Sequence, residues 1–406
     1  MKRLLVENIG ELLLPTDHGL GIVGAASVLI VDNKIVFAGA AKDTPTPPLD
    51  CPRLDAGGRL VSPGLCDPHA HLVFAGSRAH EFDLRNQGKS YLEIQAAGGG
   101  ILSTVKATRA ASDDVLTAGL LGRLDRLLAG GVTLAEAKSG YDLTPDGELR
   151  LLRLLAASTH PVALSPTFLF HVPDPSLSSA ERGPWLDRLV DETLPAAATA
   201  KLCRAVDVYC DEGAFTLAET RRILTKGKSL GLMLRTHAEQ FTHTGAAELA
   251  AELGAHSVEH LEQLGPETPA RLAAAGTVCN LLPGAALTLR LPWPNARRLL
   301  SAGCRVALGT DCNPGSSLTE SQTLMMSLAT TMMRMTAAEA WLGVTRHAAH
   351  ALGADDAGHL GPGARGDLVL WDATDHREIP QHLGASLAHT VVVAGAIKIS
   401  NHNRVS

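Results

Sequence analysis

Eight short apolar segments alternate with amphipathic helical segments, and this alternation constrains the fold of the chain more than any other feature. The expected strands span residues 59–67, 132–138, 162–170, 206–212, 232–239, 256–261, 277–282 and 305–311. Most are nearly continuous apolar runs, as parallel strands buried on both faces should be. The pattern predicts an α/β fold, a (β/α)8 TIM-like barrel. A doubly wound open sheet is the second architecture, but no GxGxxG motif follows the first expected strand.

The expected helices carry their own start and stop signals. The clearest spans residues 113–131, with apolar residues at helical spacing, Ser112 as a candidate N-cap and glycines at its end.

Both ends of the chain differ from the alternating middle part, because they contain short β-rich runs punctuated by glycine and turn residues. Asp32-Asn33, between two apolar runs, predicts a hairpin turn. We therefore expect three segments: residues 1–60, a barrel at 61–360, and residues 361–406.

Charge and cysteine content exclude several classes of protein. The formal net charge of −6 and the pI near 6.3 argue against nucleic acid or an anionic membrane as a partner. Glu7 and Glu11 interrupt the apolar stretch that a signal peptide would need, and the sequence has no apolar run of membrane-spanning length. Seven dispersed cysteines without a CxxC motif predict neither a disulfide framework nor a zinc knuckle. We expect a cytoplasmic protein with reduced thiols.

The catalytic face of a (β/α)8 barrel lies at the C-terminal ends of its strands, and polar residues gather there in this sequence. They follow seven of the eight expected strands: His69 and His71, Lys138 with Tyr141, His171, Asp211 with Glu212, His237 with Gln240, Glu259 with His260, and Asp311 with Asn313. Only the seventh expected strand ends without an ionisable group. The coincidence predicts a polar site at the mouth of the barrel.

A metal site is the chemistry that best fits this set. His69 and His71 are separated by one residue, so both side chains of the extended segment point the same way. With His237 and Asp311 they form a nitrogen and oxygen donor set suited to zinc or ferrous iron, with room for water. Such a metal makes water a nucleophile near neutral pH. Asp311 would then accept the water proton and pass it to a leaving nitrogen, and His260 would polarise a carbonyl.

Three neighbouring residues have simpler interpretations. Lys138 lies on the second expected strand, which favours a structural ion pair over a lysine that bridges two metals, so one metal is expected. Cys66 and Cys312 are interpreted as small packing residues rather than ligands.

The residues at the mouth resemble the amidohydrolase superfamily of metal-dependent barrel hydrolases. The resemblance is densest in DPHAHLVFAGSRAHEF from Asp67, in the Gly-rich segment from Ser90, and in KSGYDL, HAEQF and TDCNPGSS. Within the superfamily the chain is similar to the enzymes that hydrolyse 4-imidazolone-5-propanoate to N-formimino-L-glutamate in histidine degradation. The resemblance implies a small β-sandwich domain built from the N- and C-terminal segments, one zinc or iron ion per chain, and a homodimer.

The resemblance also assigns residues to the substrate. His69, His71, His237 and Asp311 would bind the metal, and His260 would assist at the carbonyl. Arg78 would clamp the propanoate carboxylate, a task suited to a planar bidentate donor. The remaining expected substrate contacts are Tyr91, Tyr141, His171, Gln240, Asn313, Gly315 and Ser316.

Two departures and two alternatives belong to this interpretation. The segment around His171 reads TFLFHVPDP, which differs from the family pattern, and Gln240 stands where part of the family has glutamate. Because an amide cannot accept the proton, the base is expected to be Asp311, with Glu239 as a neighbouring carboxylate.

Another cyclic amidohydrolase or a heterocycle deaminase is the alternative activity. A non-catalytic scaffold is the alternative of a different class, although all four metal ligands are present.

Overall fold

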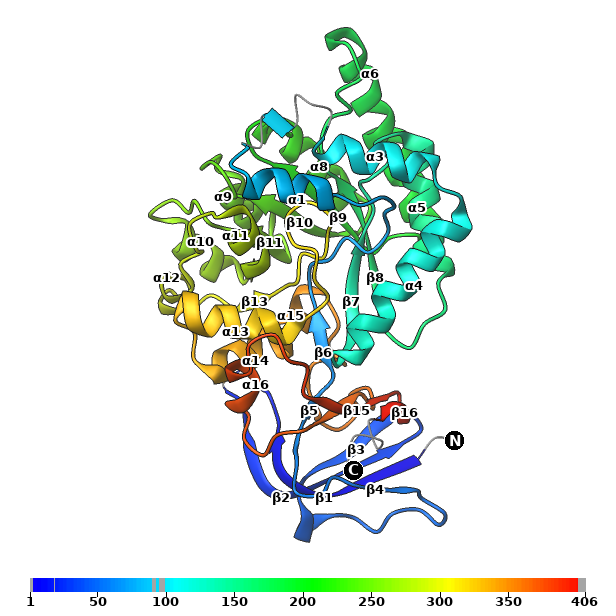
Figure 1. Ribbon diagram of the computed structural model, residues 1–406, viewed down its shortest axis with the longest axis vertical. Coiled ribbons are helices and arrows are strands. Elements are labelled where there is room, and N and C mark those ends of the chain that lie inside the picture. Colours follow the sequence, from blue (N-terminus) through cyan, green and yellow to red (C-terminus); the bar gives the residue numbers. More distant parts are fainter. Residues whose placement is uncertain (1–2, 18, 90–92, 95–98, 401–406) are drawn as a thin grey trace.

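The computed structural model describes residues 3–17, 19–89, 93–94 and 99–400, and the chain folds into two parts (Figure 1). The larger part is a barrel of strands surrounded by helices. The smaller part, at the other end of the molecule, is a sheet to which the first and last segments of the chain both contribute.

Eight parallel strands form the barrel in sequence order, which confirms the predicted architecture. They are β6 (Leu65–Asp67), β7 (Val132–Lys138), β8 (Ala163–Phe170), β9 (Ala205–Cys210), β10 (Met233–Ala238), β11 (Ser257–His260), β12 (Val278–Leu281) and β13 (Val306–Leu308). Nearly every residue of these strands is buried, because helices cover the outer face and side chains fill the interior.

The barrel closes between its first and last strands just beyond the ends of both strands. The Asp311 amide donates to the His69 carbonyl at 2.9 Å, and the His71 amide donates to the Cys312 carbonyl at 3.0 Å. Below them, the side-chain amide of Gln322 donates to the carbonyls of both β6 and β13, at 2.8 and 2.9 Å. The closure therefore brings the His69–His71 segment and Asp311 side by side.

The helices follow the barrel strands, and several begin at recognisable caps. Ser112 accepts a hydrogen bond from the Val115 amide, as predicted, and Thr216 and Thr336 form capping boxes with the glutamates three residues later. The helices are α1 (Ala79–Asn86), α3 (Ile101–Ala110), α4 (Asp113–Ala129), α5 (Pro145–Ala157), α6 (Ser179–Arg188), η2 (Leu189–Thr193), α7 (Leu194–Thr199), α8 (Leu217–Ser229), α9 (Ala246–Leu253), α10 (Thr268–Ala275), α11 (Pro283–Leu289), α12 (Ala296–Ser301), α13 (Gln322–Met333), α14 (Ala337–Val344), α15 (Arg346–Ala351) and α16 (Glu378–Gln381).

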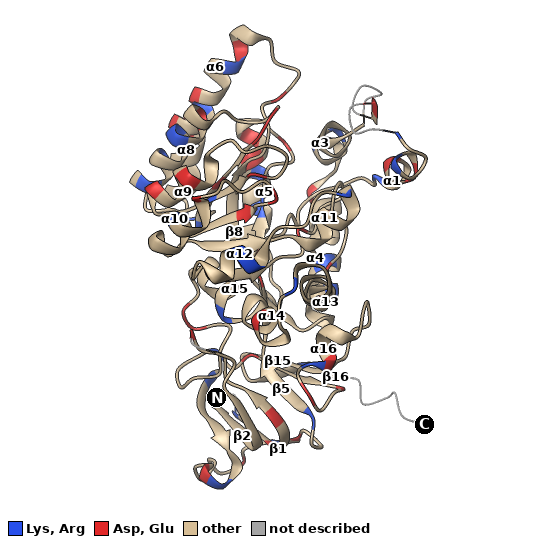
Figure 2. Ribbon diagram, turned by 90° about the vertical axis from the view of Figure 1, so that its left-hand side faces the viewer, with Lys and Arg blue, Asp and Glu red and all other residues tan. Residues whose placement is uncertain are grey.

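The outer helices carry charges of both signs. Figure 2 shows acidic and basic residues interspersed on α6, α8 and α9. Ion pairs join these helices, such as Arg182 with Glu219 and Arg221 with Glu252, both at 2.6 Å. Ion pairs at the surface contribute little to stability. None of the helices in the described part of the chain is long and apolar enough to cross a membrane.

The second part is a mostly antiparallel sheet in the order β16-β15-β14-β5-β1-β2-β3, with β4 beside β1. Its strands are β1 (Arg3–Leu13), β2 (Ile22–Val31), β3 (Lys34–Ala40), β4 (Arg53–Asp55), β5 (Leu60–Pro63), β14 (Leu368–Trp371), β15 (Ala388–Val393) and β16 (Ala396–Ser400), with the short helix η1 (Ala41–Asp43) after β3. Asp32 and Asn33 join β2 to β3 with positive φ angles of 52° and 67°, so the predicted hairpin is confirmed. This sheet encloses its own apolar core.

One predicted strand is divided between the two parts. Residues 59–67 were expected as a single barrel strand, but β5 pairs with β1 and β14 in the terminal sheet, and only β6 belongs to the barrel. Gly64 lies at the break, where a Cβ atom would collide with the side chain of Thr133. The glycine allows the chain to pass close to β7 while it leaves one sheet and enters the other.

Candidate active site

A pocket opens at the C-terminal ends of the barrel strands, where the sequence predicted it. Its cavity has a volume of about 120 Å³. Predicted site residues that line it are His71, Arg78, Tyr141, His171, His237, Gln240, His260, Asp311, Asn313, Gly315 and Ser316. His69 lies directly beneath this lining and contacts Asp311. Tyr91 is outside the described residues.

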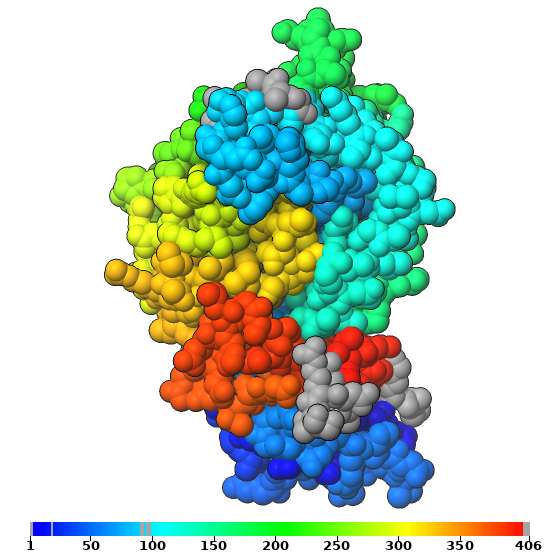
Figure 3. Space-filling view, in the orientation of Figure 1, coloured from blue at the N-terminus to red at the C-terminus, as the bar shows by residue number. Residues whose placement is uncertain are grey.

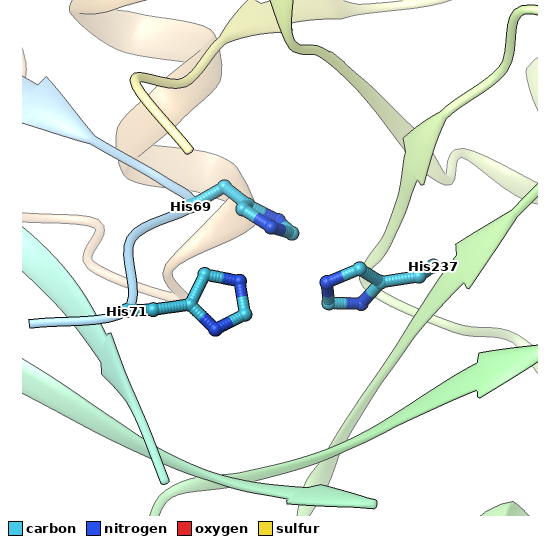
Figure 4. A group of neighbouring side chains, drawn as sticks. All are labelled: His69, His71 and His237. Atoms are coloured by element: carbon cyan, nitrogen blue, oxygen red, sulfur yellow. The ribbon is translucent and has the colours of Figure 1, made fainter. Parts of the chain in front are cut away.

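Three histidines converge at the floor of the pocket (Figure 4). His69 and His71 follow β6, and His237 comes from the C-terminal end of β10. One ring nitrogen from each lies within 4.8 Å of the others, and all three side chains are buried. Nε2 of His69 is buried without a hydrogen-bond partner among the described residues. Because a buried polar atom normally has a partner, this orphaned nitrogen fits a metal ligand.

Asp311 completes the group from the segment that follows β13. Its Oδ1 atom lies 3.4 Å from Nε2 of His69 and 3.4 Å from Nε2 of His71. Its backbone has a φ of 51°, which is unusual for a residue other than glycine and turns the carboxylate toward the histidines. Although burial acts to raise the pKa of Asp311, the contacts with His69 and His71 hold it well below its usual value. The carboxylate is therefore available as an anionic ligand or proton acceptor.

The protonation of the histidines suits a metal. Burial lowers the pKa of His69 well below its usual value, and the nearby charge of Lys138 acts in the same direction. Burial also lowers the pKa of His237 to about 4, against the opposing effect of Asp207. Neutral imidazoles offer the lone pairs that zinc and iron bind, so the residues present fit such an ion.

A fully buried ionic layer lies beneath the histidines, inside the barrel. It comprises Glu136, Lys138, Asp207, Arg235 and Glu259. Lys138 Nζ lies 2.7 Å from Glu136 and 2.6 Å from Asp207, and Arg235 contacts Glu136 at 3.0 Å. Although burial opposes its charge, these carboxylates hold the pKa of Lys138 above its usual value. Lys138 thus forms the structural ion pair that its position on the second strand predicted.

This layer also contacts two of the three histidines at the floor of the pocket. Nδ1 of His69 lies 3.1 Å from Glu259, and Nδ1 of His237 lies 3.0 Å from Asp207. A carboxylate on Nδ1 leaves Nε2 as the atom that faces a metal, and it makes the imidazole a stronger donor. Sequence analysis placed Glu259 at the mouth of the barrel but did not identify it as a partner of His69, and it missed Asp207, which looks like one polar interruption of an apolar strand.

We expect Asp207→Asn to weaken metal binding by about 10- to 100-fold, because the neutral amide supports His237 less well than the carboxylate. The measurement is competition between the enzyme and a chromogenic chelator. Asp191→Asn is the matched control, since Asp191 forms ion pairs with Arg222 and Lys226 on the outer surface. Equal metal affinities for Asp207→Asn and the native protein would exclude this role.

His260 is the last residue of β11 and lines the pocket beside His237. Its ring centroid is 5.4 Å from that of His237, and its Nδ1 is 3.6 Å from Glu262. Burial alone would lower the pKa of His260, but the carboxylate of Glu262 raises it above the usual value. The ring can therefore offer a proton or a hydrogen bond to an oxygen in the pocket.

Tyr141 and His171 form one wall. Their rings pack edge to face at 5.2 Å, and Nδ1 of His171 lies 3.1 Å from the Gly140 carbonyl. Burial lowers the pKa of His171 well below its usual value and raises that of Tyr141. The wall thus presents a neutral imidazole and a protonated phenol.

The opposite wall is cationic. Nε and Nη2 of Arg78 contact Oε2 of Glu81 at 2.9 and 2.8 Å, and Arg85 donates from Nη1 to the Gly315 carbonyl at 2.8 Å. A Cβ atom at Gly315 would collide with Nη1 of Arg78, so a larger residue there would require the guanidinium to move. Figure 3 shows the blue surface of α1 next to the yellow surface of the chain after β13, in agreement with these contacts. Sequence reasoning missed Arg85.

The Asn313–Ser316 turn is held by its own side chains. Oδ1 of Asn313 accepts hydrogen bonds from the amides of Gly315 and Ser316, both at 2.8 Å. Its Nδ2 donates to the Asp311 carbonyl at 2.7 Å. Ser316 donates from Oγ to Asp311 at 3.2 Å. The turn therefore fixes the Asp311 carboxylate while it lines the pocket.

Gln240 points into the pocket, whereas its neighbour Glu239 does not. The carboxylate of Glu239 is fully buried and contacts Nδ1 of His243 at 2.7 Å and the amides of Thr244 and Gly245 at 2.9 and 3.1 Å. Asp211, also expected near the mouth, accepts hydrogen bonds from the Phe241 amide and the Thr242 hydroxyl. Both acids organise the loop after β10, and Asp311 is the carboxylate that faces the metal ligands.

Comparison with known proteins places these residues in context. Residues 60–399 match the amidohydrolase family. The chain is 43% identical to an imidazolonepropionase from Myxococcus xanthus, over 98% of this chain and 97% of that protein. It is 45% identical to an imidazolonepropionase from Caulobacter vibrioides, over 94% of this chain and 96% of that protein.

A solved structure supports the fold. The crystal structure of an adenosine deaminase from Xanthomonas campestris with bound zinc matches with a TM-score of 0.71. The match covers 98% of this chain and 93% of that chain at 19% sequence identity. At this identity the likeness concerns the arrangement of barrel and sheet.

Proposed function

We propose that this chain, which belongs to the imidazolonepropionases of the amidohydrolase family, hydrolyses the ring C–N bond of 4-imidazolone-5-propanoate to give N-formimino-L-glutamate in histidine degradation. The observation that carries the proposal is a single pocket in which a three-histidine cluster with an adjoining carboxylate faces a cationic wall. The histidines and the carboxylate suit the hydrolysis of a cyclic amide. The cationic wall suits an acidic side arm on the same molecule.

One zinc or iron ion per chain is part of this proposal. His69, His71, His237 and Asp311 would hold it, and their nitrogen and oxygen atoms suit either metal. When bound, such an ion supplies the Lewis acidity that activates water and polarises a carbonyl. Lys138 is engaged by two carboxylates in the ionic layer, which supports one ion rather than a pair bridged by lysine.

Asp311 serves as general base in the proposed reaction. Its ionised carboxylate accepts a proton from the attacking water and delivers that proton to the ring nitrogen as the C–N bond breaks. The hydrogen bond from Ser316 and the turn at Asn313 hold the carboxylate in place for both transfers. His260 donates a hydrogen bond to the carbonyl oxygen, where negative charge develops during attack.

The other pocket residues bind and orient the substrate. Arg78 pairs with the propanoate carboxylate, and Gly315 and Ser316 lie beside it at the end of the substrate arm. Gln240, His171 and Tyr141 contact the ring. Asn313 and Tyr91 complete the set of proposed contacts.

The test is loss of the ultraviolet absorbance of freshly generated imidazolonepropionate, before and after chelation and return of metal. We expect turnover that chelation abolishes and that zinc or iron restores. Protein that holds metal without this turnover would exclude the substrate, and a panel of cyclic amides with and without a propanoate arm would then test the alternative activities. Purified protein that binds no metal would indicate a non-catalytic scaffold.

A further inference from the structure

We propose that Tyr209 is a positioning residue that fixes the side-chain amide of Gln240 as a hydrogen-bond donor to the ligand. The ring atom opposite Gln240 must then be an acceptor, such as a carbonyl oxygen or an unprotonated ring nitrogen. This inference rests on the proposed function for the identity of the ring, but the contacts that carry it belong to the protein alone.

Tyr209 lies one residue before the end of β9 and lines the pocket. Its hydroxyl donates to Oε1 of Gln240 at 3.0 Å. Its ring centroid lies 5.5 Å from that of His237 and 6.1 Å from that of His171. The tyrosine is thus held by the metal-site histidine on one side and by the pocket wall on another, and its hydroxyl has a defined direction.

The backbone of Gln240 is fixed as well. Glu239, which precedes it, has a φ of 60° and a carboxylate bound by the loop that follows. Asp211 accepts hydrogen bonds from the amides of Phe241 and Thr242, at 2.8 and 3.1 Å. Buried acids on both sides therefore hold the backbone, and the hydroxyl of Tyr209 binds the oxygen end of the side-chain amide.

The contact with Tyr209 leaves Nε2 of Gln240 as the polar atom of the amide that is available to a ligand. Because Oε1 accepts from Tyr209, Nε2 is the end of the amide that faces the cavity, and among the described residues it has no hydrogen-bond partner. An amide nitrogen donates and does not accept. A donor that is already oriented before the ligand arrives binds with less loss of side-chain freedom than one that must be ordered on binding.

The experiment measures kcat/KM for imidazolonepropionate with Tyr209→Phe, Gln240→Leu and the double variant. Removing the tyrosine hydroxyl leaves its ring in place, and we expect kcat/KM to fall by about tenfold, the effect of one net hydrogen bond. We expect Gln240→Leu to cause a loss of about 30-fold, because the leucine cannot donate to the ring. Tyr209→Phe should then cause no further loss in the Gln240→Leu protein.

The double variant separates positioning from general structure. Independent losses that multiply in the double variant would show that Tyr209 acts without Gln240, and they would overturn the inference. Gln240→Glu is the second test, since a carboxylate keeps the bond from Tyr209 but offers the ring lone pairs instead of N–H groups. Native activity in Gln240→Glu would also overturn it. If the native enzyme does not turn over imidazolonepropionate, the proposed function is wrong. If the native enzyme is active but the two losses multiply in the double variant, only the role of Tyr209 is wrong.

Discussion

Asp311→Asn is expected to lower kcat by about 10³-fold or more, because one substitution removes the proposed general base and changes a proposed metal ligand. Asparagine is nearly the same size and can keep the hydrogen bond from Ser316, so the pocket should retain its shape. It cannot accept the proton of the attacking water at neutral pH. Turnover is measured by loss of substrate absorbance, with metal content determined on the same samples.

The two readouts separate the two roles of Asp311. Lost turnover with metal still bound identifies the base, whereas loss of both shows that the carboxylate is needed to hold the ion. Asp356→Asn is the matched control, since Asp356 forms an exposed ion pair with Lys34 in the terminal sheet. Turnover of Asp311→Asn within a few-fold of the native protein would contradict both assignments.

The barrel and the residues gathered at its floor were predictable because their signals are local. The spacing of apolar residues and the length of each segment distinguish the strands from the helices between them. In a barrel, the residues that follow the strands lie at the mouth. His69, His71, His237 and Asp311 all lie at or within four residues of the C-terminal end of such a strand, so the fold brings them to the same face of the barrel. The site needed no knowledge of contacts distant in sequence.

The ionic layer was not predictable in this way. Glu136, Asp207, Arg235 and Glu259 come from four different strands, and each looks in isolation like an exposed polar residue or an error in the strand assignment. Their complete burial is tolerated because the barrel brings opposite charges together, with contacts of 2.6 to 3.0 Å. Only the three-dimensional arrangement identifies them as partners of the metal-binding histidines.

The cationic wall could be predicted from the sequence only in part. Arg78, Glu81 and Arg85 recur at a spacing of three and four residues, so one face of α1 could have been expected to carry all three. Gly315, which lies against both arginines, is more than two hundred residues away in the sequence. Spacing could predict the face, but it could not predict what the face contacts.

Arg78→Ala is expected to raise KM by about 10²-fold for imidazolonepropionate, because it removes the positive partner of a buried carboxylate. We expect kcat to change little, since the arm is distant from the reacting bond and binds equally in the ground and transition states. Initial rates over a range of substrate concentrations give both values. An unchanged KM with reduced metal content would show that Arg78 does not bind the propanoate.

Glu81 makes the expected loss larger than that of one contact. With Arg78 gone, the carboxylate of Glu81, only 9% exposed, would face the carboxylate of the substrate, and like charges at short range repel. Arg78→Ala/Glu81→Gln should therefore recover part of the KM increase, whereas Arg78→Lys keeps the charge but loses the planar donor pair. A cyclic amide with a neutral arm should bind both arginine variants as the native enzyme does. If the neutral compound lost as much affinity as the acid, the guanidinium would shape the pocket rather than recognise the carboxylate.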